Sequence, residues 1–230
     1  MKHLKIYIIR HGETKANEVA PSSGGKEIKS IRENVDIEIE TFIHGAMCAG
    51  YSGRCVMSNF LTNRDANRGG CAQSCRWNYD IYQDNKKVSP GEFDFTMSSA
   101  DLTALEQIPA LIDAGVTSLK IEGRMKTLHY IATVVNAYRR CIDEYYETGK
   151  IEHIDEYKEA IAKGQNRQVS HGFLLGPVTN KEEIYDNTRK PSHEFIGIVQ
   201  SYDINTQMVT MELRNYFESH REMEIFSPKN

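Results

Sequence analysis

The chain has 230 residues, of which 40% are hydrophobic and 26% charged, and its formal net charge is −4. This length is enough for one large domain or two small ones with a substantial core. The composition excludes a disordered acidic tail, and the charge gives no overall attraction to nucleic acid, so an RNA contact would need a local basic patch. No apolar run approaches the ~20 residues that span a bilayer, and no signal-peptide pattern is present, so we expect a cytoplasmic protein without membrane contact.

Strand and helix patterns alternate through most of the chain. An apolar run at residues 4–9 predicts a buried strand, residues 20–25 have loop composition, and a short helix and a strand are expected next, at 26–33 and 35–43. Residues 45–77 are rich in Gly, Ser, Asn, Arg and Cys, which predicts a long functional loop with short helical turns.

The second half continues this alternation and then changes character. Short strands are expected at 79–83 and 93–96, and Ser98, Ser99 and Asp101 offer N-cap chemistry for a helix that Gly115 ends. Further elements follow in order: a strand at 117–121, helices at 126–148 and 154–163, and strands at 195–201, 207–213 and 222–226.

This order predicts an α/β fold, with a partial TIM-like (β/α) barrel followed by a small all-β C-terminal domain. We expect a first strand and linker at 1–25, the barrel portion with the cysteine loop at 26–150, a helical and loop connection at 151–191, and an incomplete small β-barrel at 192–230. Two polar segments directly follow predicted strands, His44–Cys48 and Glu122–Arg124. Since barrel sites gather at the carboxyl ends of strands, the two segments are expected to share one rim.

Four of the five cysteines lie close together in the sequence, at Cys48, Cys55, Cys71 and Cys75. In a reducing compartment such a group is more often a metal or cluster site than a set of disulfides. Six, fifteen and three residues separate successive members, which is no standard zinc spacing. Cys141 lies alone in a predicted helix, where core packing is expected.

The sequence around these cysteines resembles a known family. Glu40-Thr-Phe-Ile-His-Gly-Ala-Met-Cys48, followed by Ser52-Gly-Arg-Cys55 and Ser58, is similar to the signature of peptidase family U32. Two further blocks match, Ser118-Leu-Lys-Ile-Glu-Gly-Arg-Met125 and the shorter Gly172-Phe-Leu-Leu-Gly176. The likeness runs from about residue 26 to the C-terminus.

The resemblance implies a barrel domain followed by a small β-barrel. Many members are described as collagenase-like proteases, whereas others hydroxylate RNA or quinones. The Asn67-Arg-Gly-Gly-Cys-Ala-Gln-Ser-Cys-Arg-Trp77 run is similar to the branch that takes part in prephenate-dependent hydroxylation of the tRNA wobble uridine. Hydroxylating relatives hold a 4Fe–4S cluster through cysteines of this loop, so the resemblance implies a cluster, tRNA and prephenate, and it leaves a second subunit of the same family open.

The residue types suit this role, although four packed, reduced thiols are the alternative. Four thiolates can surround a cubane cluster. Arginines of the loop would offset anionic thiolates or meet RNA phosphates, and Trp77 would stack on a base. The expected RNA-binding residues are Arg54, Arg64, Arg68, Arg76 and Trp77.

Four further residues are candidates for catalysis: Lys120, Glu122, Arg124 and His44. Lys120 and Glu122 share one face of a predicted strand, either as an acid/base pair or as a structural ion pair. His44 is either a substrate ligand or a structural hydrogen-bonding residue.

A second resemblance concerns the first 18 residues. The run Ile9-Arg-His-Gly-Glu13 is similar to the opening of the histidine phosphatase family, and Val169-Ser-His-Gly172 to its second histidine segment. We expect a phosphatase-like start joined to an internal, truncated portion of the U32 family. Four functions therefore stay open: RNA hydroxylation, a peptidase, an inactive fragment and, as a minor alternative, a histidine phosphatase. No His-Glu-x-x-His or Gly-x-Ser-x-Gly motif is present.

Overall fold

A computed structural model describes residues 5–7, 24–48, 50, 54–88, 96–165, 167–172, 174–175 and 193–227. Its centre is a five-stranded sheet in the order β1-β6-β2-β5-β7. The strands are β1 (Lys5–Tyr7), β2 (Glu40–Gly45), β5 (Asp101–Thr103), β6 (Ser118–Ile121) and β7 (Val169–Ser170). β1, β6 and β2 run parallel, whereas β5 is antiparallel to β2 and parallel to β7.

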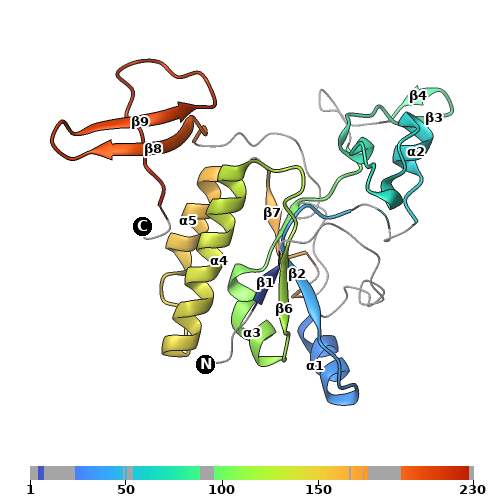
Figure 1. Ribbon diagram of the computed structural model, residues 1–230. Coiled ribbons are helices and arrows are strands. Elements are labelled where there is room, and N and C mark those ends of the chain that lie inside the picture. Colours follow the sequence, from blue (N-terminus) through green and yellow to red (C-terminus); the bar gives the residue numbers. More distant parts are fainter. Residues whose placement is uncertain are drawn as a thin grey trace.

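Helices pack against this sheet, with α4 and α5 side by side on one side of it (Figure 1). They are α1 (Gly24–Asn34), α3 (Ile108–Asp113), α4 (Leu128–Thr148) and α5 (Ile154–Gly164), with a short 3₁₀ turn, η4 (Leu105–Gln107), before α3. α4 is bounded by local chemistry. The Thr127 hydroxyl accepts the Tyr130 N–H at 3.2 Å, and Gly149 takes the left-handed conformation, φ 77°, that ends the helix.

The apolar face of α4 forms the core with alternate residues of the strands. Val134, Tyr138 and Ile142 are fully buried against Ile43 and Leu119, with Cys141 among them. The Tyr138 hydroxyl lies at the centre of this contact. It donates to the Ile43 carbonyl at 2.8 Å and accepts the Ala104 N–H at 3.0 Å, which joins α4 to β2 and to the end of β5.

A separate lobe projects from the carboxyl ends of the strands, at the upper right of Figure 1. We call residues 54–88 the cysteine lobe. It contains α2 (Met57–Thr62), the 3₁₀ turns η2 (Ala66–Arg68) and η3 (Ser74–Arg76), and a hairpin of β3 (Tyr82–Gln83) and β4 (Lys86–Lys87). This confirms the prediction of a long loop with short helical turns.

The C-terminal part is an antiparallel hairpin of β8 (Gly197–Asp203) and β9 (Met208–Leu213). Its flanking segments attach to the helices. Phe195 stacks on His129 with ring centroids 5.8 Å apart, and Glu224 forms an ion pair with Lys163 at 2.6 Å. The strand predicted at 222–226 is wrong, because these described residues form no strand.

Other predictions are corrected in the middle of the chain. The parallel arrangement holds for β1, β6 and β2 and between β5 and β7, but β5 is antiparallel to β2, and the described strands form an open sheet. Asp101 is not a helix cap: it begins β5, where its N–H donates to the Gln168 carbonyl at 2.9 Å and its side chain is buried among cations. Tertiary pairing overrides local N-cap preference here. The strand predicted at 93–96 lies largely outside the described residues, and so does the predicted domain boundary between residues 191 and 192.

The Tyr138 contact predicts a measurable stability effect. Tyr138→Phe leaves the buried His44 Nδ1 without a partner and removes a donor from the Ile43 carbonyl, so we expect the free energy of unfolding to fall by about 1–3 kcal/mol. Urea denaturation measures this change. Tyr146→Phe is the matched control, because Tyr146 lies on the same helix with 45% of its surface exposed, and an equal loss there would contradict the assignment.

Candidate functional site

The two polar segments expected on one rim do meet in space. β2 and β6 are parallel neighbours, and the Glu122 N–H donates to the His44 carbonyl at 2.8 Å. Gly45 follows at φ 115°, and a Cβ there would lie 2.5 Å from the Glu122 carbonyl oxygen. Only glycine permits so close an approach, so the chain entering the cysteine loop lies against the end of β6.

Arg124 joins this rim to the cysteine lobe. Its guanidinium donates to the Gly69 carbonyl at 2.9 Å, and its N–H donates to the Glu122 carboxylate at 3.1 Å. Both residues come from the second family-like block, whereas Gly69 lies two residues before Cys71 in sequence. In this structure Arg124 therefore holds the lobe in place, and its predicted catalytic role stays a prediction.

Lys120 has a different partner from the one expected. Its side chain is 5% exposed, and its ammonium group lies 2.7 Å from the Glu40 carboxylate, which also accepts the Ser118 hydroxyl at 3.0 Å. The ion pair of Lys120 is therefore with Glu40 rather than with Glu122, and the catalytic roles predicted for Lys120 and Glu122 stay predictions. Glu40 and Lys120 lie on neighbouring parallel strands, and the ion pair lies between those strands rather than at the rim.

His44 is buried, with its ring between Tyr138 and Tyr130. The Tyr138 hydroxyl already donates to Ile43, so the His44 Nδ1–H donates to it at 3.2 Å. This fixes the tautomer and leaves Nε2 as a bare acceptor without a partner among the described residues. Burial, aided by Lys126, lowers the pKa of His44 to about 3, so the imidazole is neutral at pH 7.

A buried carboxylate that we assigned only to helix capping is central to the site. Asp101 is fully buried, and three cations approach it: Lys126 at 2.9 Å, Arg167 at 3.4 Å and Arg76 at 3.7 Å. Lys126 also lies 4.5 Å above the Tyr130 ring. These residues come from four separate segments, so no local sequence pattern marks the cluster.

Hydrogen bonds within the cysteine lobe hold its irregular backbone. The buried Ser58 hydroxyl donates to the Arg64 carbonyl at 2.8 Å and accepts the Ala72 N–H at 3.0 Å. The Asp65 side chain accepts the Asn67 N–H at 2.9 Å, which caps η2. The lobe thus brings Cys55, Cys71 and Cys75 into one small region next to the strand ends.

All five cysteines are free thiols, and Cys141 is buried in α4 as predicted. Although the Cys48 residue is exposed, neighbouring protein atoms desolvate its thiol and, with the thiols of Cys71, Cys75 and Cys55, raise its pKa. Burial also raises the pKa of Cys75, with Cys71 and Cys55 contributing and Arg76 opposing them. The four thiols thus lie within electrostatic reach of one another. The described residues form no group of three or more ligands arranged around a single metal ion.

The predicted RNA-binding residues divide into two groups. Arg54, Arg64, Arg68 and Trp77 are exposed on the lobe, and Trp77 is 45% exposed. Arg76 turns inward, with only 10% of its side chain exposed, to pair with Asp101. This arginine connects the lobe to the sheet, so its structure favours a positioning role over phosphate contact.

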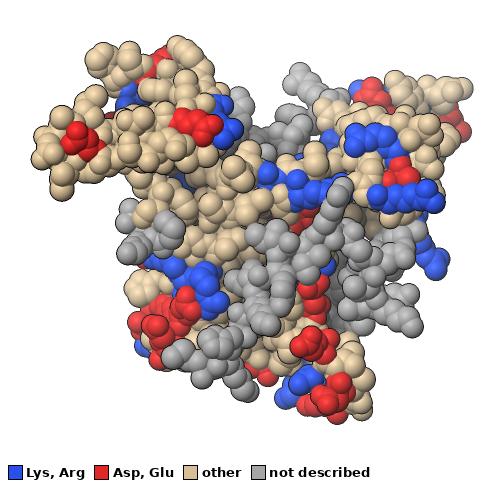
Figure 2. All heavy atoms as spheres, in the orientation of Figure 1, with Lys and Arg blue, Asp and Glu red and all other residues tan. Residues whose placement is uncertain are grey.

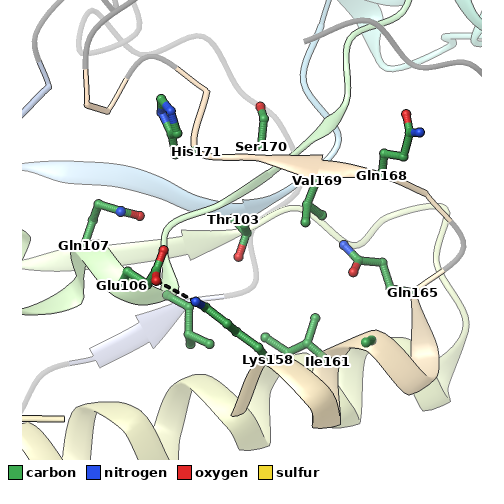
Figure 3. Close-up of a pocket in the computed structure, with 12 residues that line it drawn as sticks. Thr103, Glu106, Gln107, Lys158, Ile161, Gln165, Gln168, Val169, Ser170 and His171 are labelled. Carbon is green, nitrogen blue, oxygen red and sulfur yellow. Dashed lines mark hydrogen bonds and ion pairs between the residues drawn. The ribbon is translucent and has the colours of Figure 1, made fainter. Parts of the chain in front are cut away.

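A pocket of about 560 Å³ lies elsewhere, between the β5–β7 edge and α5 (Figure 3). Lys158 and Glu106, which both line the pocket, form an ion pair with 2.5 Å between the ammonium and carboxylate groups. Val169 and Ile161 contribute apolar walls. None of its lining residues is a cysteine. His171 of the phosphatase-like segment lines it, but Arg10 and His11 of the other segment lie outside the described residues.

In the described part of the chain, no helix combines the length and the apolar character that crossing a bilayer requires.

A thiol-rich loop held over the carboxyl ends of parallel strands defines a candidate metal or cluster centre on an α/β sheet. Residues 22–184 match the model of peptidase family U32, and this chain belongs to that family. It is 47% identical over 218 residues to tRNA hydroxylation protein P1 of Bacillus subtilis, covering 92% of this chain and 52% of that protein.

Two other relatives carry different names. The chain is 36% identical over 185 residues to the 23S rRNA 5-hydroxycytidine C2501 synthase of Escherichia coli, covering 75% of the chain and 26% of that enzyme. It is 38% identical over 141 residues to a collagenase of Porphyromonas gingivalis, covering 61% of the chain and 39% of that protein. The chain thus spans about half the length, or less, of these relatives. No solved structure gives a significant match.

The buried His44 predicts a pH effect on stability. Its pKa is about 3 in the folded chain and about 6.5 when unfolded, so the unfolded state binds the extra proton between these values. Stability should therefore fall as the pH falls below about 6.5, by about 1 kcal/mol from this residue between pH 7 and 5.5. Urea unfolding of wild type and His44→Gln at both pH values measures it. Identical pH dependence in the two proteins would contradict the assignment.

Proposed function

We propose that this chain acts in RNA hydroxylation, and that Cys48, Cys55, Cys71 and Cys75 hold a 4Fe–4S cluster. The observation that supports this most is the gathering of four free thiols beside the joined ends of β2 and β6. The likeness to tRNA hydroxylation protein P1 covers 92% of this chain. A second relative, the 23S rRNA 5-hydroxycytidine C2501 synthase, is also named for a hydroxylated base of RNA.

The donor set fits such a cluster. Four thiolates are the usual ligands of a 4Fe–4S centre, and N–H groups aimed at sulfur tune it. The Gln73 N–H approaches the Cys71 sulfur at 3.2 Å. The thiols of Cys55, Cys71 and Cys75 each act electrostatically on Cys48, and such a group of neighbouring thiols suits a centre with several thiolate ligands. When bound, the cluster would supply redox or Lewis-acid chemistry.

The protein's own residues would prepare this centre. Arg124 and Arg76 fix the cysteine lobe to the strand ends through Gly69 and Asp101. His44 presents a neutral acceptor near Tyr130, whose hydroxyl is also buried without a partner among the described residues. Both atoms are available to hydrogen-bond a reacting group.

Several finer points belong to the same proposal. tRNA is the proposed partner and prephenate the co-substrate, both by family likeness, and the cytoplasm is the proposed location. The parallel strands β1, β6 and β2, with α4 following β6, suit part of a (β/α) barrel. A second subunit of the same family would be one way to complete such a barrel.

The peptidase alternative has less support from the site. A nucleophilic cysteine needs a lowered thiol pKa and an adjacent base. Here the pKa values of Cys48 and Cys75 are raised. His44 bonds to Tyr138, and no thiol–imidazole contact occurs among the described residues. The likeness to a collagenase therefore shows shared family membership rather than a protease centre.

Iron analysis tests the cluster. Protein purified or reconstituted without oxygen should bind iron and sulfide in about equal amounts. Cys55→Ser should lose most of this iron, since it removes a ligand. Cys141→Ala is the matched control, because Cys141 is buried in α4 away from the lobe, and its iron content should equal that of wild type. Iron that is unchanged in Cys55→Ser would exclude that cysteine as a ligand.

The RNA activity has its own test. The full chain, expressed in a bacterium that lacks its own tRNA hydroxylation protein, should restore hydroxylated uridine in tRNA, measured by mass spectrometry of digested nucleosides. Cys55→Ser should reduce the product at least 10-fold and Cys141→Ala should not. Absence of the product with iron-replete wild-type protein would reject the activity for this chain.

A further inference from the structure

Large side chains are unusually exposed on the cysteine lobe. On α2, Phe60 is 87% exposed and Val56, one turn earlier, is 72% exposed. Further along the lobe, Trp77 is 45% and Tyr82 62% exposed. Exposed apolar groups gathered on one surface mark an interaction site, because leaving them in water has a free-energy cost.

The lobe's own fold places these residues in one region. α2 packs against η3, and Trp77 directly follows η3 in the chain. Tyr82 lies on β3 of the adjoining hairpin, opposite Lys87 on β4. Figure 1 shows α2, β3 and β4 together at one corner of the molecule. The three aromatic rings thus belong to the same lobe as Cys55, Cys71 and Cys75.

The same lobe is locally basic in an acidic protein. Residues 54–88 contain six Lys and Arg against three Asp and no Glu, although the whole chain has a net charge of −4. Figure 2 shows Lys and Arg gathered over this lobe. Three of these cations are exposed and have no ion pair within the described part of the chain: Arg54, Arg64 and Lys86.

We propose that this surface binds an unpaired stretch of RNA, with bases stacked on the aromatic rings and phosphates held by the free cations. The aromatic–basic surface consists of Phe60, Trp77, Tyr82, Arg54, Arg64 and Lys86. The inference rests on the proposed function and extends it by naming the surface and the single-stranded state of the RNA. An unpaired base exposes its ring faces, whereas a duplex hides them inside the helix.

The combination of rings and cations favours RNA over a protein partner. Single-strand binding surfaces combine aromatic platforms with positive charge, and the lobe has a net charge of +3 in a chain whose net charge is −4, which favours a polyanion. The surface also adjoins the candidate cluster, since Cys55 lies between Arg54 and α2 in the chain. RNA held here would present a base close to the four thiols.

Binding of a labelled RNA stem-loop to the full chain, followed by fluorescence anisotropy, tests the surface. Phe60→Ala and Tyr82→Ala should each raise the Kd about 5-fold or more, the loss expected from one stacked base. Tyr216→Ala is the matched control, because Tyr216 is 78% exposed outside the lobe, and its Kd should stay within 2-fold of wild type. A fully paired duplex should bind at least 10-fold more weakly. Circular dichroism establishes that each variant is folded.

Trp77 offers a direct readout, since it is the only tryptophan in the chain. Stacking of a base should quench its emission, and saturation should follow the anisotropy curve. The logarithm of the binding constant should fall linearly with the logarithm of the salt concentration. Replacing Arg54 and Arg64 together by Gln should make this slope less steep by about 1.4, or about 0.7 for each lost phosphate contact. Lys29→Gln, on α1, should leave this slope unchanged.

Each contrary result has a clear meaning. Unchanged affinity in both aromatic variants, or unchanged Trp77 emission at saturation, overturns the surface. A dimer that Phe60→Ala dissociates without altering RNA affinity also overturns it, in favour of a protein contact. The proposed function can fail separately: stem-loop binding that depends on Phe60, with no iron and no hydroxylated product, keeps the surface and rejects the cluster activity.

Discussion

The buried carboxylate of Asp101 is the constraint on which the site's geometry depends. It lies at the start of β5 and meets Lys126, which follows β6, Arg167, which precedes β7, and Arg76 of the cysteine lobe. A buried charge is tolerated only when it is paired and hydrogen-bonded. Because the cations that pair with Asp101 come from three different segments, these segments are held close to the start of β5. The ion pair between Arg76 and Asp101 therefore links the lobe to the buried end of the sheet.

Two further contacts restrict the lobe once Asp101 has attached it. Arg124 reaches from the end of β6 to the Gly69 carbonyl, and Gly45 lets the backbone of β2 touch that of β6. Both lie at the carboxyl ends of parallel strands, where α/β folds collect polar groups. The irregular segment that carries three of the cysteines is thus anchored at both sides, although it contains little regular structure of its own.

How far the sequence predicts this arrangement depends on the range of the interactions. α4 follows from helical spacing, an N-cap at Thr127 and a stop at Gly149, all of which are local. The shared rim of β2 and β6 follows from a general rule about parallel strands. The roles of Asp101 and Lys120 do not, because their partners lie far away in the chain: Glu40 is eighty residues from Lys120. The residue types predict that Lys120 forms an ion pair, but only the fold shows that its partner is Glu40.

The formation of a strand, β5, where the sequence predicts the start of a helix illustrates the same limit. Ser98, Ser99 and Asp101 have side chains that commonly cap helices. The Ala104 N–H, however, donates to the Ile43 carbonyl and to the Tyr138 hydroxyl. Those partners come from β2 and α4, and they draw residues 101–103 into the sheet before a helix can begin. Local preference here is worth about 1 kcal/mol, which several tertiary hydrogen bonds and a buried ion cluster outweigh.

Charge is also divided unevenly along the chain, with a consequence for how a polyanion would approach. Outside residues 54–88 there are 22 Lys and Arg against 29 Asp and Glu, a net charge of −7, whereas the cysteine lobe has a net charge of +3. Such a dipolar distribution repels a phosphate backbone from most of the molecule and attracts it to one lobe. Binding elsewhere is disfavoured, so the lobe that carries three of the four thiols is also the part that RNA would meet first. The two halves of the proposal, the cluster and the RNA surface, therefore share one physical location without sharing residues.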